Sequence, residues 1–305
     1  MPVGPSLRSQ NLQPIQDLKG ARSIMKSLLI LVGLFLCLCC GRGDAADLNF
    51  VVIQPGQPGS PEEAQPIMNA LANYLKERVN ADKIEGNYEN RLPEALEMLR
   101  HVKPRWGIVS LPFYVRHAEA LQLIPVASTR PNGRSKDVWT LMAPRDTAGD
   151  WRDLRGTILG TMLFEPSSAS CLIFGVAYRQ LSMHFEGTSQ PLLAIRRMVN
   201  GRPAGKDISA VVLDSSQVEA LKTLPLAEKL RVIHQSAELP TSPVVSFGPP
   251  DEGIRKLVGA LMAMKENEKG RELLQILQTE GFGAPDDTLD GFRLKTEEQN
   301  GRCPP

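Results

Sequence analysis

Cysteine is scarce in this sequence once its first 45 residues are set aside. Three of the five cysteines lie in that N-terminal stretch, at positions 37, 39 and 40, which leaves Cys171 and Cys303. The Cys-x-x-Cys spacing at 37–40 is not expected to be a redox motif, because it lies inside the uncharged apolar run at 28–40. Cys171 and Cys303 could form one disulfide, but we favour Cys171 as a small buried apolar residue and Cys303 as part of a loose tail.

An excess of charge and long apolar runs are also missing. The first 45 residues hold five of the 35 Lys and Arg and two of the 34 Asp and Glu, so residues 46–305 carry a formal charge of −2. This balance gives no electrostatic argument for binding nucleic acid or an anionic membrane. No apolar run after residue 46 approaches the roughly 20 residues that span a bilayer. We therefore expect a soluble chain of two modest domains or one large one.

Common catalytic motifs are absent as well. The chain has no Gly-x-Ser-x-Gly, no His-Glu-x-x-His, no phosphate loop ending in Gly-Lys-Ser/Thr and no dinucleotide glycine pattern. Its four histidines, at positions 101, 117, 184 and 234, show no metal-ligand spacing. We expect no enzyme, no metal and no cofactor, although a Ser–His–Asp set built from distant positions stays an alternative.

The N-terminus is typical of a secretory signal peptide. Lys26 is followed by an uncharged apolar run at 28–40, and small residues then lead to Ala45. Such a run is too short for a permanent membrane helix. We expect cleavage after Ala45 and a periplasmic product, with residues 1–24 as an upstream extension. A lipid-anchored form is the less favoured alternative, because no residues make a good lipobox.

After the signal, short buried strands alternate with amphipathic helices. The alternation is the pattern of a parallel α/β sheet. Strands are expected at 48–53, 83–89, 106–110, 137–144, 156–163, 208–213, 230–234 and 244–247. Helices are expected at 67–79, 92–99, 168–181 and 189–200, after Asp214, and twice between 251 and 280.

Three hydroxyls stand in four positions where one such strand gives way to a helix. They belong to Ser167, Ser168 and Ser170. The start of a helix leaves backbone N–H groups unpaired and carries the positive end of the helix dipole, so it attracts an anion. Serine hydroxyls add donors there. The alternative is that Ser167 or Ser168 simply caps the helix.

Taken in order, several segments resemble the periplasmic solute-binding proteins of phosphate, phosphite and phosphonate ABC transporters. The resemblance covers 47–292, and the order and spacing of its pieces carry it. The pieces are 106–114 (WGIVSLPFY), 153–156 (DLRG), 165–170 (EPSSAS), 200–202 (NGR), 209–214 (SAVVLD), 230–233 (LRVI) and 281–287 (GFGAPDD).

This resemblance implies an α/β fold with two lobes, of the type 2 periplasmic-binding architecture, in which the ligand lies in the cleft between the lobes. Residues 47–138 plus 243–305 would form lobe one, and 140–238 would form lobe two. The crossings would be 137–144 and 237–246.

The resemblance also implies which residues bind the ligand. The family's ligand-binding positions match the three serines, Tyr114 and Asp214, and Tyr88 and the loop that begins at Gln54 lie near them. From the residues themselves, Asp214 could pair with a cationic ligand group or cap the next helix. Trp139 could line the cleft or be buried at the hinge, and Tyr114 could be ordinary core.

We therefore expect an exported solute-binding protein that captures a small anionic ligand and presents it to an ABC permease in the inner membrane. The chain would act as a monomer. An enzyme or a ligand sensor on the same scaffold is the alternative, since fold does not fix function.

Overall fold

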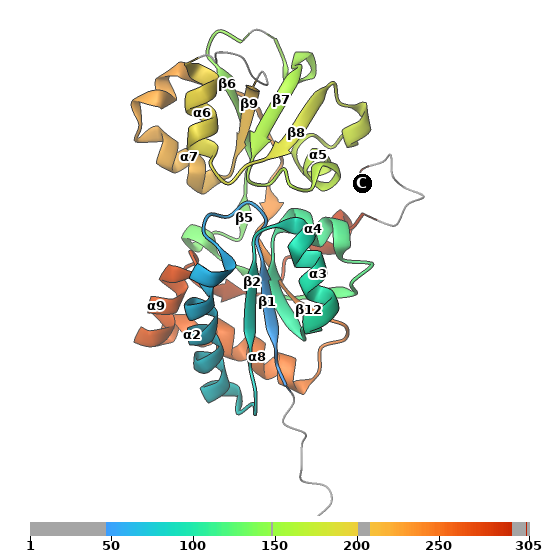
Figure 1. The fold of residues 1–305 in the computed structure, drawn as a ribbon, viewed down its shortest axis with the longest axis vertical. Coiled ribbons are helices and arrows are strands. Elements are labelled where there is room, and N and C mark those ends of the chain that lie inside the picture. Colours follow the sequence, from blue (N-terminus) through green and yellow to red (C-terminus); the bar gives the residue numbers. More distant parts are fainter. Residues whose placement is uncertain (1–46, 148, 201–207, 295–302, 304–305) are drawn as a thin grey trace, which may run out of the picture. The chain divides into compact units, whose positions relative to one another are not determined.

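The computed structural model describes residues 47–147, 149–200, 208–294 and 303. In this part of the chain, two α/β lobes are built on different sheets (Figure 1). We call the part with the six-stranded sheet lobe one and the part with the five-stranded sheet lobe two. The fold class expected from the sequence is confirmed. Within the described residues, no helix is both long and apolar enough to cross a membrane.

Lobe one contains β1 (Phe50–Ile53), β2 (Gly86–Glu89), β3 (Trp106–Val109), β4 (Leu123–Thr129), β12 (Pro243–Phe247) and β13 (Phe282–Gly283). Their order in the sheet is β13-β4-β12-β3-β1-β2. Lobe two contains β6 (Thr140–Pro144), β7 (Gly156–Gly160), β8 (Met183–Gly187), β9 (Ile208–Leu213) and β10 (Leu230–Gln235). Their order is β10-β6-β9-β7-β8.

Both sheets follow one plan. The first strand of each lobe, β1 or β7, pairs in parallel with the two strands that follow it in the chain. The strand that follows each crossing between the lobes, β12 or β6, pairs antiparallel with β3 or β9, respectively. In such sheets a ligand binds beyond the carboxyl end of the central first strand, where successive connections run to opposite faces.

Helices cover both faces of the lobe-one sheet (Figure 1). On one face, α2 (Pro61–Val79), α8 (Glu252–Met262) and α9 (Glu268–Ile276) pack with Phe50 and Val52. On the other, α3 (Leu92–Val102) and α4 (Leu111–His117) pack with Val51 and Ile53. Because successive side chains of a strand point to opposite faces, all of β1 is buried.

Lobe two is covered in the same way. Helices α6 (Pro191–Val199) and α7 (Ser215–Lys222) pack with Leu159 and Val211 on one face. Helix α5 (Pro166–Phe174) packs with Ile158 and Ala210 on the other. The cluster that holds α5 also holds α4 of lobe one, so one apolar core continues from lobe to lobe.

Short connections complete the described chain. Two-residue strands β5 (Lys136–Asp137) and β11 (Leu239–Pro240) pair antiparallel, so the two passages between the sheets run side by side. Short 3-10 turns lie at Pro131–Gly133, Trp151–Asp153, Tyr178–Gln180, Pro225–Lys229, Ala263–Glu266 and Leu289–Phe292.

Two sequence expectations are wrong. Helix α5 was expected over 168–181, but it begins at Pro166 and ends at Phe174, where Gly175 adopts a left-handed conformation that stops the helix. The cysteines are not a buried apolar residue and a loose tail, because Cys171 and Cys303 form a disulfide with their Cα atoms 5.2 Å apart. The expected signal peptide lies outside the described residues.

Candidate ligand-binding site

A cavity of about 890 Å³ lies at the carboxyl ends of the two central strands. The loop after β1 contributes residues of 54–60, and the turn after β7 contributes residues of 161–165. Residues 214–217, at the start of α7, and residues of the crossing segment up to Trp139 complete this part of the wall. Both lobes therefore supply their switch-point loops to one cavity, as expected for a ligand site in this type of fold.

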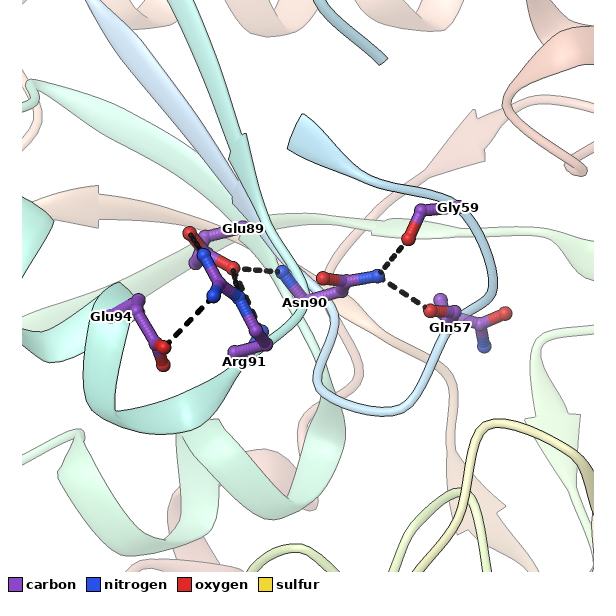
Figure 2. A network of polar contacts seen from close by, with 6 residues as sticks. All are labelled: Gln57, Gly59, Glu89, Asn90, Arg91 and Glu94. Carbon is purple, nitrogen blue, oxygen red and sulfur yellow. Dashed lines mark hydrogen bonds and ion pairs between the residues drawn. The ribbon is translucent and has the colours of Figure 1, made fainter. Parts of the chain in front are cut away.

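Asn90 fastens the loop after β1, as Figure 2 shows. Its side-chain Nδ2 donates hydrogen bonds to the carbonyl oxygens of Gln57 at 2.7 Å and Gly59 at 2.9 Å. Its own carbonyl oxygen accepts a bond from the N–H of Gly56. A segment with Pro55 and Pro58 has few N–H donors of its own, so these bonds to Asn90 fix its course.

Asn90 is itself held by a buried carboxylate. Glu89 is 7% exposed, and its Oε1 accepts bonds from the backbone N–H groups of Asn90 and Arg91. The Arg91 guanidinium pairs with Glu89 at 3.2 Å and with Glu94 at 3.0 Å (Figure 2). These contacts connect the loop to the first turn of α3.

Asp214 directly follows β9 and caps α7. Its Oδ1 accepts a hydrogen bond from the N–H of Gln217, and the Gln217 side chain accepts one from the Asp214 N–H in return. Gln217 Nε2 also donates to Thr161 Oγ1 in the turn after β7. Burial raises the pKa of Asp214 above its ordinary value, and the nearby negative charge of Asp137 raises it further.

The Asp137 carboxylate accepts three hydrogen bonds near the start of α7. Its Oδ1 accepts bonds from the N–H groups of Val138 and Ser215, and its Oδ2 accepts one from Trp139 Nε1 at 3.1 Å. Trp139 is thereby held with its indole against the cavity, and it is only 6% exposed. The start of α7 is also tied to the crossing strand β5 by these bonds.

The wall is acidic. Its charged residues are Glu63, Asp137, Glu165, Asp214 and Glu280 against Arg134 and Lys136. Lys136 is neutralised by Asp286 at 2.6 Å. Arg134 makes no close ion pair within the described part of the chain, although its charge helps to lower the pKa of Glu219.

Four of the residues expected from the sequence lie in this wall. They are Gln54, Tyr88, Trp139 and Asp214. Tyr88 is half-buried, and burial raises the pKa of its hydroxyl. The structure brings these four together from β2, the loop after β1, the crossing segment and the end of β9.

The other four expected residues do not line the cavity. Because α5 begins earlier than expected, Ser168 and Ser170 turn inward and are fully buried, while Ser167 is exposed. Ser170 Oγ donates to the Ser167 carbonyl oxygen. Tyr114 is fully buried, and its hydroxyl contacts Asp290 and Arg293, with burial raising its pKa to about 12.

Sequence reasoning missed the residues that set the cavity in place. Asn90 and Glu89 read as the end of a strand, and nothing local marks them as holding a loop more than thirty residues away. Glu165 lines the cavity and pairs with His117 of lobe one, a contact that no pattern around either residue marks.

The described residues contain no group of three or more His, Cys, Asp or Glu side chains that could hold a metal. Ser170 bonds to a backbone carbonyl and Cys171 is in a disulfide, so neither is paired with a base.

Comparison with known proteins agrees with the resemblance expected from the sequence. Residues 204–289 match a family described as ABC transporter, phosphonate, periplasmic substrate-binding protein. The matched stretch includes Asp214 and the start of α7, which line the cavity. No curated protein sequence matches the chain.

Solved structures share the fold. XAC2383 from Xanthomonas citri, bound to chloride, has a TM-score of 0.63 and 16% identity, over 80% of this chain and 93% of that chain. A binding protein component of an ABC phosphonate transporter from Pseudomonas aeruginosa has a TM-score of 0.56 and 16% identity, over 81% and 83%. PhnD1 from Prochlorococcus marinus, in complex with methylphosphonate, has a TM-score of 0.56 and 11% identity, over 81% and 95%.

Proposed function

We propose that this chain is the solute-binding protein of an ABC transporter and takes a phosphonate-like ligand into the cavity between its two lobes. The observation that carries the proposal is the coincidence of two findings. The stretch that matches the phosphonate-binding family contains residues 214–217, and these residues form part of the cavity wall. A ligand held there would contact both lobes, as hinge closure around a solute requires.

The lobe boundaries belong to the same proposal. We assign 47–138 plus 243–305 to lobe one and 140–238 to lobe two, with crossings at 137–144 and 237–246. The pairing of β5 with β11 supports this division, because it places the two crossings next to each other.

The charge of the wall refines the ligand class. Five acidic and two basic side chains suit a ligand that carries a cationic group beside its anionic one. We propose a zwitterionic phosphonate with an amino group. Asp214 would hold the ammonium, since its carboxylate lines the cavity, and Trp139 would form an aromatic wall beside the cation.

The phosphonate end would meet donors from both lobes. Arg134 supplies charge, Ser110 and Thr161 supply hydroxyls, and Gln54 supplies an amide. Tyr88 completes the lobe-one side of the wall. The chain would thus bind its solute without chemical change, and we propose no enzymatic activity for it.

A ligand screen by thermal unfolding tests the proposal. Protein purified from the periplasm of an expression host is heated with an aminoalkylphosphonate, methylphosphonate, phosphate, a sulfonate or a neutral amino acid. We expect the aminoalkylphosphonate to raise Tm most, in proportion to the logarithm of its concentration over Kd. The proposal is overturned if no phosphonate or phosphate raises Tm at millimolar concentration.

Export through a cleaved signal peptide and docking on an inner-membrane permease are further parts of the proposal. The disulfide between Cys171 and Cys303 supports an oxidising compartment such as the periplasm. The intact mass of the periplasmic protein reports the cleavage site, expected after Ala45, and an added diacylglyceryl mass would show a lipid anchor instead. Its sedimentation velocity reports whether it is the expected monomer.

A further inference from the structure

A histidine–glutamate pair joins the two lobes beside the cavity. His117, at the end of α4 in lobe one, places its Nε2 2.6 Å from Oε1 of Glu165, which precedes α5 in lobe two. Because a carboxylate only accepts hydrogen bonds, the imidazole Nε2 is the donor. The two side chains are 18% and 11% exposed, so the contact is largely shielded from water and correspondingly strong.

Glu165 belongs both to this contact and to the cavity wall, whereas His117 belongs to the contact alone. The imidazole is steadied by the ring of Phe113, one turn earlier on α4, at a centroid distance of 4.5 Å. The apolar core around it continues from α4 into α5. The pair therefore lies at the junction of the lobes, and one of its members, Glu165, also lines the ligand site.

Other contacts between the lobes differ from this one in place or strength. Asp137 accepts a bond from the Ser215 N–H at the crossing segment, where the chain itself joins the lobes. Asn132 donates to Ser216 Oγ at 3.1 Å, but that bond is exposed and neutral. The disulfide is covalent and joins α5 to Cys303.

We propose that the His117–Glu165 pair is an interlobe latch that stabilises the closed arrangement of the lobes and slows release of the ligand. Separation of the lobes would pull His117 away and leave the Glu165 carboxylate without its donor. Opening would exchange this charge-assisted bond for hydrogen bonds to water, so the open form is disfavoured by the net strength of the bond. The effect on ligand release rests on the proposed function, whereas the effect on lobe opening does not.

The test compares two histidine–glutamate pairs of the same chain. His117→Phe keeps a ring against Phe113 but removes the donor, and His117→Gln returns a donor. The matched control is His101→Phe, because His101 pairs with Glu97 at 2.8 Å on the surface of α3, with side chains 73% and 56% exposed. Lobe opening of the ligand-free proteins is followed by small-angle X-ray scattering, and release of an aminoalkylphosphonate by stopped-flow fluorescence.

We expect His117→Phe to increase the radius of gyration of the ligand-free protein and to speed ligand release on the order of tenfold. His117→Gln should recover part of both changes, and His101→Phe should match the parent. A ligand-free radius that responds in this order supports the latch even if the phosphonate does not bind. The latch is overturned if His117→Phe and His101→Phe give the same radius, or if His117→Phe changes the radius equally in a Glu165→Ala background, which lacks the acceptor.

Discussion

Gly56 lies so close to Phe164 that a Cβ atom on Gly56 would stand 2.5 Å from Cε2 of the ring. The same Cβ would lie 2.7 Å from the carbonyl oxygen of Thr161, and the backbone of Gly56 has a φ of +86°. Only glycine allows the loop after β1 to approach the turn after β7 in this way. The closeness of the two switch-point loops therefore depends on one missing side chain.

Gly56→Ala should weaken ligand binding by tenfold or more. The new methyl group meets a backbone oxygen that cannot move aside, so the two loops must separate and the cavity wall is disturbed. Isothermal titration with the best phosphonate of the screen measures the loss. Gly248→Ala is the matched control, because Gly248 has a similar φ of +89° but no atom within 4 Å of the added Cβ. Both variants should lose about 1–2 kcal/mol of stability through backbone strain. Equal affinities in the two variants would contradict the prediction.

Asn90→Ala should loosen the loop after β1. It removes two hydrogen bonds to backbone carbonyl oxygens, at Gln57 and Gly59, which together contribute about 1–3 kcal/mol. Hydrogen exchange in the loop should speed up, and ligand affinity should fall by a comparable amount. Glu94→Ala serves as the control, since it breaks only the Arg91–Glu94 pair, which has exposed side chains and contributes at most about 1 kcal/mol. If loop exchange is unchanged in Asn90→Ala, the loop is held by something else.

The sequence predicts the fold better than the site, and Asp214 and Ser168 show why. Asp214 stands directly after a buried strand, and strand ends in a parallel sheet meet at one edge, so its place in the cavity wall follows from local pattern. Ser168 also stands near a strand end. Its direction depends on where α5 begins, and a shift of two residues rotates each side chain of a helix by more than half a turn.

Contacts between distant segments are harder still to predict. Glu165 meets His117 because α4 of lobe one packs on α5 of lobe two, and no local pattern in either segment encodes that packing. The disulfide is equally hard to predict, since its cysteines are 132 positions apart in the sequence. Only the folded chain brings two such distant residues together.

Asp214→Asn should change stability in a pH-dependent way. The folded-state pKa of Asp214 lies above 3.8, its ordinary value, so the folded protein holds that proton more tightly than the unfolded chain does. Stability from this group is therefore present at low pH and is lost as pH rises through the folded pKa. Asparagine carries no charge and caps a helix equally well. The variant should match the parent below the ordinary pKa and gain stability relative to it as pH rises toward neutral.

Urea unfolding across this pH range measures the difference, and a constant offset at every pH would refute the assignment. The same variant separates the ligand classes. It should lose affinity for an aminoalkylphosphonate, whose ammonium needs the carboxylate, and keep its affinity for methylphosphonate.

Ser168→Ala decides whether the hydroxyls at the start of α5 bind the ligand. Ser168 Oγ is fully buried and has no hydrogen-bond partner among the described residues, so removing it should be neutral or stabilise the protein by up to about 1–3 kcal/mol. Ligand affinity should not change, because Ser168 does not line the cavity. Ser170→Ala is the companion variant; it loses a bond to the Ser167 carbonyl oxygen and should destabilise by about 0.5–1.5 kcal/mol, again with unchanged affinity. A tenfold loss of phosphonate affinity in Ser168→Ala would show that the start of α5 does bind the ligand, because a buried hydroxyl away from the cavity has no direct contact to lose.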